Sequence, residues 1–126
     1  MDQLPFSPPY TLFIHSSSAS NTAMADLFES YASDFASLTE SIRSKLQSAK
    51  DEQGEVRKAS LRRAQMEADE ADEVLGQMDI ELQSFPQSIK NRYSLKVREA
   101  KTDLNKLKKE LVSDQQVEAA VHWRND

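Results

Sequence analysis

The fold is decided by residues 61–85, LRRAQMEADEADEVLGQMDIELQSF, in which apolar side chains recur at alternating steps of three and four residues. Such steps keep side chains on one face of an α-helix, so the segment predicts an amphipathic helix with a heptad pattern. Small side chains in the first half allow close approach of a neighbouring helix, whereas the second half is bulky. The stripe consists of Leu61, Ala64, Ala68, Ala71, Leu75, Met78, Leu82 and Phe85.

A similar apolar stripe lies on each side of this segment. Asp26 and Glu29 have the spacing of a helix N-cap and its N3 position, which predicts that the first helix starts there and ends near Ala49. Gly54 and Pro86 then separate the three periodic segments. The upstream stripe is Phe28, Tyr31, Phe35, Leu38, Ile42 and Leu46, and the downstream stripe is Tyr93, Val97, Ala100, Leu104, Leu107 and Leu111.

Three amphipathic helices with short connections predict an all-α fold, an elongated antiparallel up-down-up three-helix bundle. The bundle is expected over residues 25–112. Residues 1–24, rich in proline and serine, are expected to be a flexible leader, and residues 113–126, where the apolar pattern has faded, a flexible tail. The core is expected to include Phe35, Leu38, Leu75, Met78, Val97, Ala100 and Leu104.

The charges favour pairing of the second and third helices. Residues 51–85 contain four basic and ten acidic side chains, net −6, whereas residues 86–111 contain eight basic and three acidic, net +5. Opposite charges on neighbouring helices bias the topology, although each exposed pair contributes only a few tenths of a kcal/mol.

The composition argues against several classes of function. The 126-residue chain has no cysteine, which excludes disulfides, thiolate zinc sites and a cysteine nucleophile. Its two histidines, His15 and His122, lie in opposite terminal segments, so neither is expected to bind a metal or to act as a general base. No glycine-rich phosphate loop or catalytic signature motif occurs. We therefore expect no enzymatic activity, no cofactor and no metal ion.

Two charged segments have a functional interpretation as well as a structural one. The carboxylates of residues 67–73 would point outward from a convex helix, which favours a solvated face over a calcium site. The basic segment KNRYSLKVREAK, residues 90–101, suggests nucleic acid or anionic lipid as an alternative to a structural role. The net charge of −5 and pI of about 5.1 favour the structural role, so no nucleic-acid partner is expected. No signal peptide or span of about 20 apolar residues is visible, which predicts a soluble, cytoplasmic chain.

Two apolar residues do not fit the stripes. Ile80 lies between Met78 and Leu82, and Leu95 lies between Tyr93 and Val97, so both are expected to point away from the core. Single exposed apolar residues are common. The alternative is a docking surface for a partner protein. The candidate partner-binding residues are Asp79, Ile80, Glu81, Leu95, Lys96 and Arg98.

Residues 26–111 resemble the N-terminal domain of the Vti-type vesicle-transport SNAREs, the Qb-SNAREs of Golgi, endosome and vacuole traffic. The segment LFESYASDFASLTESIRSKL is similar to the first helix of that family. The family run L-x-x-M-[DE]-x-E is met by Leu75, Met78, Asp79 and Glu81. The run K-x-R-x-x-[KR]-x-[DE]-L-x-x-[LI]-[KH] is met by Lys96, Arg98, Lys101, Asp103, Leu104, Leu107 and Lys108.

The resemblance implies a monomeric Habc-like regulatory module, recognised by ENTH-domain clathrin adaptors of the epsin type. It also implies a place on the cytosolic face of Golgi, endosomal or vacuolar membranes for the full-length protein. Family members continue into a coiled-coil SNARE motif and a membrane anchor, through which they join other SNAREs, and both are absent here. The chain is thus expected to be one domain, a truncated product or an unusual gene product. The alternative hypothesis is a structural coiled-coil scaffold that self-associates through its heptads.

Overall fold

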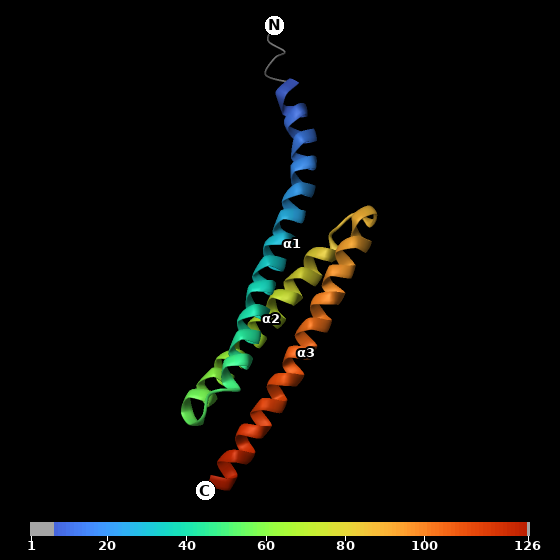
Figure 1. Cartoon of the computed structure of the whole chain (residues 1–126). Coiled ribbons are helices and arrows are strands. Elements are labelled where there is room, and N and C mark those ends of the chain that lie inside the picture. The colour runs from blue at the N-terminus through green and yellow to red at the C-terminus, as the bar shows by residue number, and fades with distance from the viewer. Residues whose placement is uncertain (1–6, 126) are drawn as a thin grey trace.

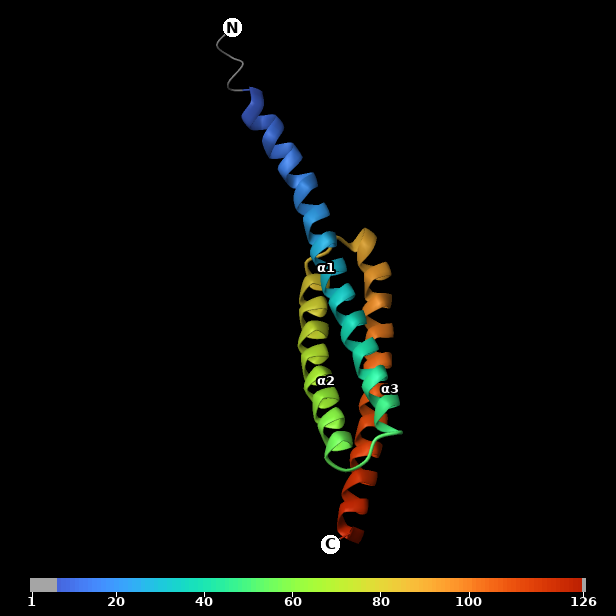
Figure 2. The same ribbon diagram turned by 60° about the vertical axis from the view of Figure 1, so that its left-hand side comes forward.

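The computed structural model describes the backbone of residues 7–125 and the side chains of residues 23–121. It contains three helices, α1 (Ser7–Ala49), α2 (Gly54–Gln83) and α3 (Gln87–Asn125), and no strand in the described range. The helices run up, down and up and pack against one another over the stretch that α2 covers (Figure 1). Figure 2 shows that the start of α1 extends past the α2–α3 loop, and the end of α3 past the α1–α2 loop. The expected elongated three-helix bundle is confirmed.

Two predicted helix boundaries are wrong. Helix α1 begins at Ser7 rather than Asp26, so Asp26 and Glu29 lie within a continuous helix and do not cap its start. Helix α3 continues to Asn125 instead of ending near Leu111. Apolar periodicity marks where a helix packs, and a helix can continue beyond its packed part. The prediction that residues 1–24 and 113–126 are flexible remains a prediction.

The residues beyond the apolar stripes are compatible with helix for local reasons. Pro8 and Pro9 fall in the first turn of α1, where proline removes no intrahelical hydrogen bond. Residues 113–125 contain neither glycine nor proline. This part of α3 also contacts α2, because the Arg57 guanidinium lies 3.3 Å from the Glu118 carboxylate and both side chains are less than one-fifth exposed. The end of α3 is therefore held against the start of α2.

The two connections follow the predicted breaks. Helix α1 ends at Ala49, and Gly54 begins α2 with φ +63°, a left-handed conformation that glycine adopts without a Cβ clash. At the other connection, the N–H of Phe85 donates to the carbonyl of Leu82. The carbonyl of Pro86 in turn accepts hydrogen bonds from the first turn of α3. Each break thus reverses the chain in a few residues.

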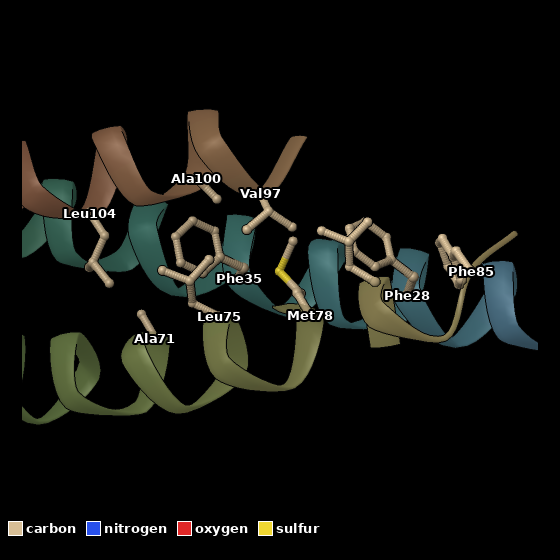
Figure 3. Packing of buried hydrophobic residues seen from close by; sticks show 10 residues of the cluster. Phe28, Phe35, Ala71, Leu75, Met78, Phe85, Val97, Ala100 and Leu104 are labelled. Atoms are coloured by element: carbon tan, nitrogen blue, oxygen red, sulfur yellow. The ribbon is translucent and has the colours of Figure 1, made fainter. Parts of the chain in front are cut away.

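The predicted stripes form the core. Every position of the α2 stripe is buried, and six of the seven expected core residues are buried, whereas Leu38 is only partly buried. Figure 3 shows Leu104 of α3 and Ala71 of α2 pointing toward one another. Thr39 is a buried polar residue that the pattern did not predict, and its hydroxyl donates to the carbonyl of Ala36 at 3.0 Å. That bond satisfies the hydroxyl inside the bundle.

The buried residues form two clusters. The corner cluster, next to the α2–α3 loop, consists of Phe28, Phe35, Ala71, Leu75, Met78, Leu82, Phe85, Val97, Ala100 and Leu104. The alanine cluster, toward the α1–α2 loop, consists of Ile42, Leu46, Ala49, Leu61, Ala64, Ala68, Leu107 and Leu111. The small side chains of the alanine cluster let α1 lie close to α2, as the sequence predicted.

Enlarging a side chain in the alanine cluster should therefore destabilise the bundle. Ala68 has no exposed surface, so Ala68→Leu must displace α1 and should lower the free energy of unfolding by about 1 to 3 kcal/mol. Urea denaturation followed by circular dichroism measures this. The matched control is Ala120→Leu, because Ala120 is exposed on α3. Equal stabilities of the two variants would contradict the close packing of α1 on α2.

Ion pairs join α2 and α3, as the charge distribution predicted. Lys101 lies 4.0 Å from Asp79, and Lys108 pairs with Asp72. These side chains are between one-third and just over one-half exposed, so each pair contributes at most about 1 kcal/mol. Apolar packing is the larger effect, and it gives α2 a more extensive contact with α1 than with α3.

Candidate interaction surface

Ile80 and Leu95 lie outside the core, as their misfit to the stripes predicted. Ile80 is 58% exposed and Leu95 is 53% exposed, whereas Met78 and Val97, two residues away, are almost completely buried. Two residues correspond to about 200° around a helix, so each side chain points away from the buried face. These are large apolar groups that the bundle itself does not use.

Both residues lie at one end of the bundle. Ile80 is in the last turn of α2, which ends at Gln83, and Leu95 is in the third turn of α3, which begins at Gln87. The loop between them carries Pro86. Because each side chain points outward from a different helix, a partner touching both would have to cover this corner.

The charged residues of the candidate site are not gathered into one patch. Asp79 faces α3, where it pairs with Lys101. Lys96 faces α1 instead, since its Nζ lies 2.8 Å from the Glu29 carboxylate. Asp79 and Lys96, which adjoin Ile80 and Leu95 in the sequence, thus lie at two different helix–helix contacts, α2–α3 and α1–α3.

The other two charged residues make no ion pair among the described side chains. Arg98 is exposed, and Glu81 is half-buried. Arg98 is therefore the member of the charged set that is most available to a partner.

An aromatic cluster at the same corner was not predicted as a unit. The ring of Phe28 lies 5.7 Å from that of Phe85 and 4.9 Å from that of Tyr93, and Phe85 and Tyr93 are also 4.9 Å apart. The two contacts to Tyr93 are edge-to-face, a favourable geometry for aromatic rings. Figure 3 shows Phe28 beside Phe85. The cluster joins α1, α3 and the loop that follows α2, so the corner that carries Ile80 and Leu95 is firmly packed.

The signal for this cluster was present in the sequence. Phe85 precedes Pro86, and Tyr93 opens the third stripe, so two aromatic residues flank the turn. In an up-down-up bundle the predicted start of the first helix lies at this same end, and Phe28 is close to that start. Combining the topology with the stripes would have placed the three rings together.

Comparison with known proteins identifies the family. Residues 24–115 match the family described as the vesicle transport v-SNARE protein N-terminus. The chain belongs to this v-SNARE family. The v-SNARE match includes both sequence runs on which the resemblance to Vti-type SNAREs rests, and that resemblance is confirmed.

Individual relatives agree with the family match. The chain is 38% identical to vesicle transport v-SNARE 12 of Arabidopsis thaliana over 88 residues, which are 69% of the chain and 40% of that protein. It is 33% identical over 84 residues to human vesicle transport through interaction with t-SNAREs homolog 1A, covering 67% of the chain and 39% of the relative. The chain thus spans about 40% of the length of these v-SNARE relatives. No solved structure matches it.

The acidic segment of the v-SNARE domain takes part in contacts between helices. Glu67 accepts a hydrogen bond from Ser41 at 2.8 Å and pairs with Lys45 at 3.1 Å, so it faces α1. Among the described side chains, no group of three or more His, Asp or Glu residues is placed to hold a metal ion. His15 and His122 lie outside the side chains that the structure describes. No helix in the described range is both long and apolar enough to cross a membrane.

Proposed function

We propose that this v-SNARE domain is a non-enzymatic protein-interaction domain in intracellular vesicle-mediated transport. The family match over residues 24–115 supports the process. The observation that carries the interaction role is the exposure of Ile80 and Leu95 beside a firmly packed corner. A rigid corner presents apolar anchors at little entropic cost, a common property of binding hot spots.

We further propose the partner and the place of action. The partner of the corner is an ENTH-type clathrin adaptor that covers Ile80 and Leu95. Of the four charged candidates, Asp79, Glu81, Lys96 and Arg98, it contacts Arg98 first, because Asp79 and Lys96 are paired within the bundle. The full-length protein acts on the cytosolic face of Golgi, endosomal or vacuolar membranes. The name of the human relative states interaction with t-SNAREs, which supports other SNAREs as further partners of the longer protein.

The docking surface is tested by removing both anchors. The double variant Ile80→Ser and Leu95→Ser should remain folded, because neither side chain supports the core. It should weaken binding to an epsin-type ENTH domain at least tenfold, or roughly 1.4 kcal/mol. Calorimetric titration of the two purified domains measures the affinity, and circular dichroism checks folding.

The same helices supply a matched control. Met66 of α2 is 66% exposed and Val112 of α3 is 49% exposed, and both lie farther from the corner than the anchors. The control variant Met66→Ser and Val112→Ser should bind the ENTH domain like the unmodified chain. An unchanged affinity in the folded Ile80 and Leu95 variant would rule this surface out.

The core favours a monomeric domain over the self-associating scaffold. The heptad positions of all three helices are occupied by contacts within one chain. A coiled coil between chains needs an exposed apolar seam, and these stripes do not provide one. Analytical ultracentrifugation distinguishes the two hypotheses, because a scaffold would sediment as a dimer or a larger species.

A further inference from the structure

The outward side of α3 is a basic surface that the contacts within the bundle leave free. Arg98, Lys106 and Lys109 are exposed and make no ion pair among the described side chains, unlike Lys101 and Lys108, which pair with α2. At 100° per residue, these three cations lie within about 60° of Leu95 around the helix axis, a sector that also contains Arg92, Glu99 and Glu110. The basic face, defined as Leu95, Arg98, Lys106 and Lys109, therefore has Leu95 at its N-terminal end beside Arg98, with Lys106 and Lys109 about 17 and 21 Å farther along the helix.

The acidic residues of α3 lie toward its flank with α1, where Lys106 also lines a groove beside Glu110. Glu99 and Asp103 line a groove between α1 and α3. Glu110 pairs with Lys50, which follows the end of α1, at 3.8 Å. Their carboxylates lower the positive electrostatic potential on that flank more than on the outward side of α3. The basic face thus keeps its positive charge at Arg98 and Lys109, whereas Glu110 partly offsets Lys106.

The bundle as a whole is electrically asymmetric. Helix α3 has nine basic and five acidic residues, net +4, and helix α2 has four basic and eight acidic, net −4, so α3 and α2 form opposite charge poles. The exposed residues Asp69, Glu70 and Glu73 are part of the negative pole. A molecule with this charge distribution orients in the field of a charged surface even when its net charge is negative.

We propose that the basic face of α3 contacts the anionic headgroups of a membrane surface. Anionic lipids attract cations within about one Debye length, roughly 8 Å at physiological salt, so three cations on one side of one helix can act together. The acidic α2 points away from the lipid in this orientation. Leu95 reaches the interface between headgroups and acyl chains, as apolar residues of peripheral helices do.

The choice of a membrane over nucleic acid rests partly on the proposed function in vesicle transport. It rests also on Leu95, because an exposed apolar side chain beside Arg98 suits a lipid interface better than a phosphate backbone. Leu95 and Arg98 belong to the proposed adaptor surface as well. Membrane contact and adaptor binding therefore exclude one another in this arrangement.

The proposal is tested by sedimenting the whole chain with vesicles. We expect binding to vesicles of phosphatidylcholine with phosphatidylserine, little binding to phosphatidylcholine alone, and release at high salt. The triple variant Arg98→Gln, Lys106→Gln and Lys109→Gln should bind more weakly by about fivefold for each cation removed. The matched control is Lys58→Gln, Arg62→Gln and Arg63→Gln, which removes the same charge from α2 and should retain binding.

Several outcomes would overturn the proposal. Equal loss of vesicle binding in the two triple variants would mean that net charge alone determines binding. Absence of binding between the unmodified chain and anionic vesicles would exclude the surface. Equally tight binding of a duplex oligonucleotide, lost in the Arg98, Lys106 and Lys109 variant, would assign the face to nucleic acid. The vesicle assay contains no adaptor, so none of these results bears on binding to an ENTH domain. The ENTH titration tests the proposed function separately.

Discussion

Replacing Phe28 by alanine should lower the free energy of unfolding by about 3 to 5 kcal/mol. Phe28 is fully buried, and its ring contacts both Phe85 and Tyr93, so the substitution removes the ring that α1 contributes to the aromatic cluster. A loss of this size is a large part of the stability of about 5 to 15 kcal/mol that is typical of small domains. Urea denaturation followed by circular dichroism measures it.

The adjacent residue provides the control. Leu27 is 42% exposed, and Leu27→Ala should change stability by about 0.5 kcal/mol or less. If Phe28→Ala were no more destabilising than Leu27→Ala, the aromatic cluster would not hold α1 in place. Phe28→Leu should lie between the two, because it keeps most of the apolar volume but loses the edge-to-face contacts.

The second large effect is expected at Leu104. Leu104→Ala should cost about 2 to 5 kcal/mol, since Leu104 is 1% exposed at the centre of α3 and packs in the corner cluster. Its small neighbours Ala71 and Ala100 cannot extend into the space that the substitution leaves. Thermal or urea unfolding gives the difference in stability.

A leucine on the same helix tests whether burial is the cause. Leu95→Ala removes the same atoms from a side chain that is 53% exposed, so it should cost much less than Leu104→Ala. A melting temperature unaffected by Leu104→Ala would contradict the packing of α3 in the bundle. Similar losses in both variants would indicate that helix propensity and not burial sets the cost.

The core was the most predictable part of the fold. The α2 stripe predicted every buried residue of its helix, because steps of three and four specify one face regardless of which helix covers it. Leu38 was expected to be buried and is only partly so. Its burial depends on how α1 is rotated against its neighbours, and periodicity alone does not give that rotation.

The helix ends and the partners of charged residues were less predictable. The stripes stop where packing becomes sparse, so they gave no signal for α1 before Asp26 or for the contact of Glu118 with Arg57. For the candidate site, the sequence predicted the exposure of Ile80 and Leu95. It did not predict that Lys96 turns to Glu29, because that choice depends on the distance between α1 and α3.

The unequal composition of the two core clusters has a consequence for motion. The corner cluster contains three phenylalanines, whereas the alanine cluster contains three alanines and no aromatic residue. Local opening is least costly where least apolar surface is buried, so backbone amides near the α1–α2 loop should exchange with solvent faster than those near the α2–α3 corner. The bundle would then loosen from the end opposite Ile80 and Leu95, and those two side chains would keep their relative positions while the far end fluctuates.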